Sequence, residues 1–211
     1  MAKLPEPPDR AALRRLDPPV HVLPAQSWIA RVYFAGGRHP SAWNGFRDWG
    51  PSPLARFDHH LPDADGHPHR QARAVLYGAP EGLTCIAEVF QQSRAIDRVR
   101  RDPFLAIFPL ARPVRLLDLT GEFATRMGAS LAIHSGPRDR TRRWAIALDD
   151  AYALDGFRYL SSMHPGAIAY VLNERARDAL PASPSFNRAL SDPILTDTID
   201  ACAARLGYLK M

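Results

Sequence analysis

A short apolar stretch near the start of the chain reads Trp28-Ile29-Ala30-Arg31-Val32-Tyr33-Phe34. Aromatic and β-branched residues make up most of it, and both kinds favour a β-strand. Successive side chains of a strand point to opposite faces, so Ile29, Arg31 and Tyr33 share one face. Arg31 therefore either presents a rigid pair of donors to an anion or lies on a half-exposed face of the sheet.

Three further segments combine an apolar run with polar side chains in the same way. Each places a charged or hydroxyl group at or beside a predicted strand, where a purely structural sequence would place turn residues. We therefore expect all four segments to contribute to one site. The three are Leu54-Ala55-Arg56-Phe57-Asp58, Leu76-Tyr77-Gly78-Ala79 followed by Ala87-Glu88-Val89, and Tyr159-Leu160-Ser161-Ser162.

The hydrophobic pattern predicts strands and helices that follow one another without a regular strand–helix alternation. The predicted connections are the Gly- and Pro-containing stretch 36–53 and the segment 62–69. We therefore expect an α+β fold, with a mixed sheet and flanking helices. Strands are predicted over 20–23, 28–34, 73–77, 105–110, 114–119, 157–161 and 167–172, and helices over 82–94, 128–134, 138–154 and 192–206.

One compact domain is predicted, because no internal repeat or long linker divides the sequence. We place it at 20–211, after an N-terminal tail and short helix over 1–19 in which Asp9 caps the helix. A chain of 211 residues with 46% hydrophobic residues can bury a core without disulfides or metals. Cys85 and Cys202 lie in apolar helical patterns and are expected to be buried, reduced thiols.

The formal net charge of +5 favours an anionic partner, which could be nucleic acid, a nucleotide or an acidic protein. Lys3 and Lys210 are the only lysines, so arginine carries nearly all of the positive charge. No stretch reaches the roughly 18 apolar residues of a membrane span, and the first twenty residues lack the apolar core of a secretion signal. We therefore expect a cytoplasmic protein that makes no membrane contact.

Common nucleotide- and metal-binding motifs are missing from the sequence. It contains no glycine-rich dinucleotide fingerprint after a strand, no phosphate-binding loop, no His-Glu-x-x-His and no Cys-x-x-Cys. Any dinucleotide is therefore expected to bind without a Rossmann-type turn.

The ordered set of four segments resembles the RES domain, a family named for its Arg, Glu and Ser residues, over most of the chain. Members include NAD-consuming toxins of bacterial toxin–antitoxin pairs. The resemblance implies a fold related to bacterial ADP-ribosyltransferases, and NAD+ as a substrate whose nicotinamide–ribose bond is cleaved without a metal. ADP-ribose would pass to a protein, to water or to phosphate. The implied NAD+ site is a cleft between the Arg31 strand and the Glu88 helix, and the implied partner is an Xre-like antitoxin that blocks this cleft.

This chemistry generates an oxocarbenium-like ribose, which calls for a carboxylate beside the sugar and donors around the diphosphate. Glu88 is the expected catalytic carboxylate, and Arg31 is expected both to assist catalysis and to anchor NAD+. Leu54 and Ala55 replace two glycines of the family pattern, which puts close backbone approach to the ligand in question. The other residues expected to bind NAD+ are Tyr33, Arg56, Tyr77, Ser161 and Ser162.

Two other groups of residues suggest different chemistry. Histidines and aspartates over 58–69 carry metal-donor atoms, but no glutamate closes a calcium loop and no cysteine joins them, so no metal site is expected. The run 138–144, Arg-Asp-Arg-Thr-Arg-Arg-Trp, is a solvated helix face, a dock for an acidic partner or a phosphate-binding surface. The alternative function is therefore an RNA-acting toxin or nucleic-acid-binding module without NAD chemistry; under the main reading, no direct nucleic-acid binding is expected.

Overall fold

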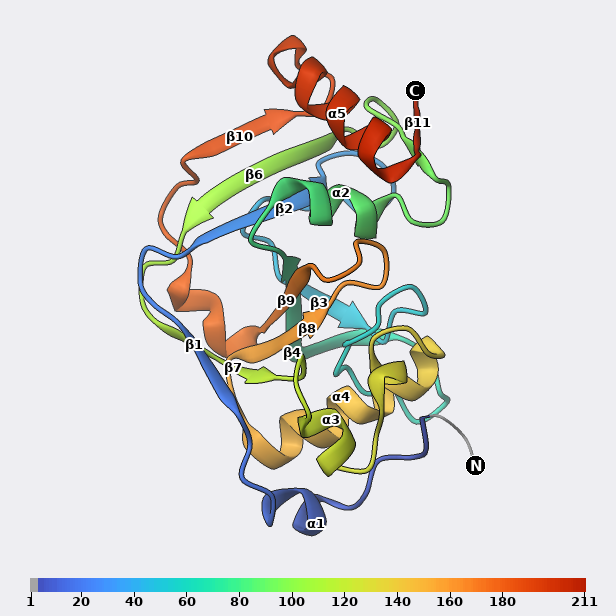
Figure 1. The fold of residues 1–211 in the computed structure, drawn as a ribbon, viewed down its shortest axis with the longest axis vertical. Helices are drawn as coiled ribbons and strands as arrows, with labels where there is room; N and C mark the ends of the chain where they lie inside the picture. Colours follow the sequence, from blue (N-terminus) through green and yellow to red (C-terminus); the bar gives the residue numbers. More distant parts are fainter. Residues whose placement is uncertain (1–3) are drawn as a thin grey trace.

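The computed structural model describes residues 4–211, and the first three residues of the predicted tail lie outside the described residues. Two sheets stack along the long axis of the molecule, with α2 and α5 at one end and α1, α3 and α4 at the other (Figure 1). The helices, including three short 3-10 turns, are α1 (Arg10–Arg14), α2 (Gly82–Val89), α3 (Phe123–Arg126), η1 (Leu131–Ile133), α4 (Arg138–Tyr152), η2 (Glu174–Ala179), η3 (Pro193–Leu195) and α5 (Thr196–Leu206).

The larger sheet has six strands in the order β1-β7-β8-β9-β4-β3, and the smaller has three in the order β10-β6-β2. Only β7 and β8 run parallel within these two sheets; the other pairs are antiparallel. The predicted α+β fold with a mixed sheet is therefore confirmed. The strands are β1 (Val20–Leu23), β2 (Trp28–Phe34), β3 (Arg47–Gly50), β4 (His69–Gly78), β5 (Ala95–Ile96), β6 (Pro103–Pro109), β7 (Val114–Asp118), β8 (Gly156–Leu160), β9 (Ile168–Asn173), β10 (Phe186–Ala189) and β11 (Leu209–Lys210).

The two sheets meet where the end of β4 touches β2. Ala30 and Ala79 form an isolated antiparallel bridge, with N–O distances of 2.8 and 2.9 Å. A side chain on Gly78 would lie 2.6 Å from Ile29 Cγ2 and 2.9 Å from the Ala30 carbonyl oxygen. Gly78 is therefore the residue that lets the two backbones come this close. Helix α2 begins only four residues later, so the junction also sets where α2 lies.

Three apolar clusters form the core. Helix α4 buries Trp144, Ala145 and Leu148, at helical spacing, against one face of the six-stranded sheet. A second cluster, which includes Ile29 and Leu76, fills the space between the sheets. The third packs α2 and α5 on the other face of β2 and contains both cysteines, which are buried and free.

Several predicted elements differ from the observed ones. The connection 36–53 contains strand β3, and β4 begins at His69, inside a segment predicted to be a loop. Helix α2 ends at Val89, well before the predicted residue 94. Asp192 caps the short turn η3, and not α5 itself, through a bond from the Ile194 amide. For β3 and β4, pairing with sequence-distant strands overrides a weak local signal.

Residues before α1 are packed against the body. Leu4 is buried, and the Trp144 indole donates to the Pro5 carbonyl oxygen at 2.8 Å. Glu6 forms ion pairs with Arg140 and Arg143 on α4. Asp9 caps α1 as predicted, by accepting from the Ala12 amide. None of the helices within residues 4–211 is long and apolar enough to cross a membrane.

A charged network ties α4 to β4 and β9. Glu174 accepts from His59 Nε2 at 2.9 Å and from the Ala74 amide at 3.0 Å. Burial opposes ionisation of Glu174, but these two bonds outweigh it and hold its pKa at about 2. Arg175 bridges Glu174 to Asp149 of α4. Folding therefore favours the ionised Glu174.

We expect Glu174→Gln to lower the unfolding free energy at pH 7 by about 1–3 kcal/mol, because it weakens hydrogen bonds to a charged, half-buried acceptor. A depressed pKa contributes stability above the unfolded value near 4.5, and that stability is lost as pH falls towards 2. Urea unfolding at pH 7, 4 and 3 should therefore show a flatter acid dependence in the variant. A pH dependence equal to that of the wild type would contradict this assignment, and Glu122→Gln, at an exposed position, is the control.

Candidate functional site

Glu88 lies near the C-terminal end of α2 and is half-buried. Its Oε1 accepts two hydrogen bonds, from Ser161 Oγ at 2.6 Å and from the Ser162 amide at 3.0 Å. Buried Thr84, Cys85, Ile86 and Ala87 fix the helix beneath it. One carboxylate oxygen is therefore locked, while Oε2 has only a 3.4 Å contact with Gln91. Such an oriented carboxylate can stabilise a positive charge that develops beside it.

Ser161 follows directly after β8, as the sequence predicted, and is buried. Besides donating to Glu88, its hydroxyl accepts from the amides of Met163 and His164 at 3.1 and 3.0 Å. Ser162 contributes its backbone amide to Glu88, and its side chain makes no hydrogen bond to another residue in 4–211. The two serines thus have different roles, and Ser161 both shapes the turn and holds Glu88.

Arg56 and Tyr77 lie on the α4 side of the six-stranded sheet. Arg56 Nη1 donates to the Gly136 carbonyl oxygen at 2.5 Å. A purely structural arginine here would be expected to form a salt bridge with Asp58 or Glu88, and Arg56 forms neither within residues 4–211. The pKa of Tyr77 is raised, first by burial and then by Asp58, and its hydroxyl has no hydrogen-bond partner in residues 4–211. An unpaired buried hydroxyl is costly unless a ligand satisfies it.

Tyr159 connects these groups electrostatically. Burial raises its pKa well above the usual value, and the charge of Glu88 adds to the effect while that of Arg56 opposes it. The electrostatic interaction with Tyr77 raises this pKa further. Glu88, Arg56 and Tyr77 all act electrostatically on Tyr159, and Ser161 holds Glu88, so we group these four residues as the Glu88 cluster.

Arg31 and Tyr33 are not joined to this cluster by a hydrogen bond or an ion pair within residues 4–211. Alternation along β2 packs Ala30 and Val32 against α2 and turns Arg31 to the other face. There Arg31 Nη2 donates to the Gly45 carbonyl oxygen at 2.9 Å, and burial lowers its pKa to about 10.

The Tyr33 hydroxyl donates to Asn187 Oδ1 at 3.0 Å, on β10. Its ring stacks on Phe104, with a centroid separation of 5.5 Å. Tyr33 is therefore engaged with β6 and β10, and the sequence alone did not predict these partners because β10 carried no clear strand signal.

Comparison with known proteins identifies the family and a similar fold. Residues 29–192 match the sequence model of the RES domain. The chain belongs to the RES domain family. A chain of the M. tuberculosis MbcT–MbcA toxin–antitoxin complex has a similar fold, with a TM-score of 0.55 and 15% sequence identity over 91% of this chain and 95% of that one. No curated protein matches the sequence closely enough to be informative.

Two residues of this RES domain's site were missed from the sequence. Gln91 donates to the Glu88 carbonyl oxygen at 2.6 Å and accepts from Arg138 Nη2 at 2.8 Å. Its position three residues after Glu88 was the available signal, because residues at that spacing are neighbours on a helix. The sequence places Arg138 in a basic run at the start of a helix. That Arg138 reaches Gln91 depends on how α4 packs against α2, which the sequence does not predict.

The histidine-rich region is occupied by contacts within the protein. His60 Nδ1 forms a short hydrogen bond with Asp58. Burial alone would raise the pKa of Asp58, but the bond to His60, the charge of Arg47 and the Ser52 amide together lower it. Asp63 accepts from the amides of Asp65 and His67, as in a tight turn. His59, Asp149 and Glu174 could meet at a metal, but two arginines already neutralise these carboxylates.

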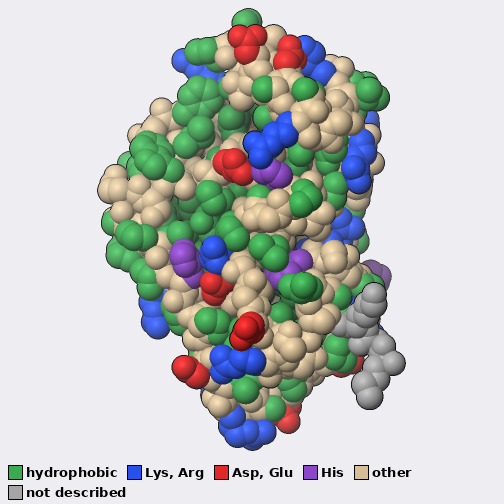
Figure 2. Space-filling model, in the orientation of Figure 1, with side chains coloured by type: hydrophobic (Ala, Val, Ile, Leu, Met, Phe, Trp, Pro, Cys, Tyr) green, Lys and Arg blue, Asp and Glu red, His purple; other side chains and the backbone are tan. Residues whose placement is uncertain are grey.

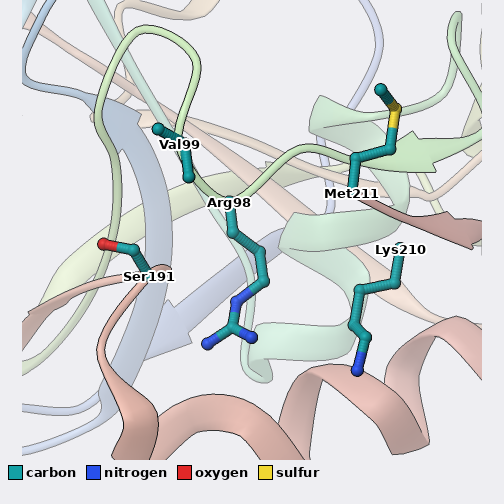
Figure 3. A pocket seen from close by; sticks show the side chains of 5 residues that line it. All are labelled: Arg98, Val99, Ser191, Lys210 and Met211. Atoms are coloured by element: carbon teal, nitrogen blue, oxygen red, sulfur yellow. The ribbon is translucent and has the colours of Figure 1, made fainter.

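Two surface cavities lie outside the Glu88 cluster. Figure 3 shows one of about 310 Å³, lined by Arg98, Val99, Ser191, Lys210 and Met211. The Arg98 guanidinium is held by Leu190, Asp192 and Thr196, so its donors are largely used. A larger cavity of about 640 Å³ borders Gly136 and Pro137, just before α4. Neither cavity gathers residues with an evident chemistry.

Ser161→Ala should lower the unfolding free energy by about 1–3 kcal/mol, because it leaves two amides and a charged oxygen without their hydroxyl partner. Ser162→Ala, the matched control, should have little effect because only its backbone contacts Glu88. Urea denaturation of the two variants tests this. Equal stabilities would show that the Ser161 hydroxyl does not hold the turn.

Proposed function

We propose that this RES domain protein is the toxin of a toxin–antitoxin pair and that it cleaves NAD+ at the Glu88 cluster. The observation that supports this most strongly is the locked Glu88 carboxylate, which interacts electrostatically with Arg56, together with a Tyr77 hydroxyl that has no partner in residues 4–211. A carboxylate, a cation and a free hydroxyl are the groups that the ribose and diphosphate of NAD+ require. The family and the fold shared with a toxin–antitoxin complex support the same assignment.

In the proposed reaction, the bond between ribose C1′ and the nicotinamide nitrogen breaks, and its electron pair leaves with nicotinamide. The ribose becomes oxocarbenium-like, and Glu88 stabilises its positive charge. Ser161 and the Ser162 amide hold the carboxylate in place. An acceptor oxygen or nitrogen then bonds to C1′ and loses its proton. A protein side chain, water or phosphate would each complete this step.

The remaining predicted residues are proposed to bind NAD+. Tyr77 would bond to a ribose hydroxyl and Arg56 to a phosphate oxygen. Nε and Nη1 of Arg31 are buried and have no partner in residues 4–211, so we propose that Arg31 also contacts an anionic group. Tyr33 would support Arg31 from the same face of β2.

The proposed partner is an Xre-like antitoxin that inserts an acidic or C-terminal carboxylate group near the arginines and competes with NAD+ in the cytoplasm. Several basic residues of the run 138–143 are paired with acidic ones. On the face shown in Figure 2, basic side chains are also interspersed with acidic ones. These observations favour a nucleotide over a long nucleic acid as the anionic ligand.

We expect Glu88→Gln to fold normally, because the amide oxygen can still accept from Ser161 and Ser162. The loss of charge should slow nicotinamide release from NAD+ by about 100-fold or more. Chromatography of the reaction measures this. In cells, the wild type expressed alone should arrest growth and the variant should not. A folded variant that releases nicotinamide at the wild-type rate would contradict the role of Glu88.

Tyr77→Phe removes an unpaired buried hydroxyl, so the unfolding free energy should stay equal or rise, while affinity for an uncleavable NAD+ analogue should fall about five-fold. Tyr152→Phe is the matched control, because it breaks the bond from the Tyr152 hydroxyl to the Leu13 carbonyl oxygen and should lower stability without changing analogue affinity. Calorimetric titration and thermal unfolding of both variants test this. Unchanged analogue affinity in Tyr77→Phe would remove Tyr77 from the proposed site.

A further inference from the structure

The basic run at the start of α4 points in two directions. Arg140 and Arg143 face outward and pair with Glu6, and Arg143 also pairs with Asp139. Arg138 faces inward and donates to Gln91, the residue that contacts Glu88. The run therefore holds two arginines neutralised by carboxylates and one arginine at the Glu88 cluster, while Arg142 donates to the Ser52 carbonyl oxygen at 3.2 Å.

A second arginine of this region, Arg56, is held at the start of the same helix as Arg138. The turn before α4 brings them together, since Arg56 donates to the Gly136 carbonyl oxygen, two residues before Arg138. The pKa of Arg56 is lowered, first by burial and then by the charge of Arg138. Within residues 4–211, neither arginine forms an ion pair with a carboxylate, and Arg138 Nε is buried without a hydrogen-bond partner.

Two adjacent guanidinium groups repel each other, and partial burial strengthens the repulsion. Carboxylates neutralise Arg140 and Arg143 but leave the pair of Arg138 and Arg56 uncompensated within residues 4–211. An anion bridging the two groups would offset the repulsion and satisfy the free donors. Guanidinium groups bind phosphate oxygens in bidentate geometry, and two of them match the two phosphates of a diphosphate.

We propose that Arg138 and Arg56 form a diphosphate-binding subsite at the edge of the Glu88 cluster, in which Arg138 is a substrate-binding residue. This inference rests on the proposed NAD+ function, because it names the residues that hold the diphosphate during cleavage. The subsite can nevertheless be tested without the cleavage reaction, because a nucleoside diphosphate that lacks nicotinamide should bind there.

The test is calorimetric titration of the full chain with ADP and, separately, with inorganic phosphate. The proteins are the wild type, Arg138→Gln, Arg138→Lys and the matched control Arg143→Gln, which removes a charge from the outer face of the same helix. Thermal unfolding checks that each protein is folded, and nicotinamide release from NAD+ is measured on the same samples.

We expect Arg138→Gln to weaken ADP binding about ten-fold or more, Arg138→Lys to weaken it less, and Arg143→Gln to leave it within about two-fold. If ADP binds the folded Arg138→Gln protein as it binds the wild type, or does not bind the wild type, the subsite is overturned. An Arg138→Gln protein that loses binding of inorganic phosphate but keeps wild-type binding of ADP would also overturn it. If the wild type releases no nicotinamide but ADP binding depends on Arg138, the subsite stands and the NAD+ reaction fails.

Discussion

The close approach of Gly78 to Ala30 sets the position of helix α2, and therefore of Glu88. Any side chain at residue 78 would collide with Ile29 and with the Ala30 carbonyl oxygen, so the two sheets can meet only with glycine there. Because α2 starts at Gly82, the junction determines where the helix crosses the end of the six-stranded sheet. Glu88 can then reach the turn after β8, and Tyr77 lies one residue before the junction. The geometry of the cluster therefore depends on one backbone contact.

Arginine has three distinct uses in this molecule. Some arginines, such as Arg175, belong to buried or half-buried ion-pair networks that fasten helices to the sheet. Others, such as Arg143, are paired on the surface. A third group, Arg31, Arg56 and Arg138, is largely removed from water and paired with carbonyl or amide oxygens instead of carboxylates. No carboxylate within residues 4–211 forms an ion pair with these three arginines, so the net charge of +5 says less about function than their position.

Much of the fold followed from the sequence, because β2 and α4 carry strong local patterns. The order of the four polar segments also identified the family, and the pairing of Glu88 with the serines lies within those segments. The sequence could not show that alternation turns Arg31 away from α2, or that Arg138 reaches Gln91, because both depend on how distant elements pack. The short strands β3 and β10 were also missed, because each depends on pairing with a distant strand. Within residues 4–211, β3 pairs with β4 alone and β10 pairs with β6 alone.

The most direct test of the central claim is a crystal structure of the Glu88→Gln protein with NAD+ bound. We predict that the nicotinamide ribose lies beside residue 88 and within hydrogen-bond distance of the Tyr77 hydroxyl, with the diphosphate at Arg56. Density for NAD+ at another location, or none at a concentration that saturates binding in solution, would contradict the account.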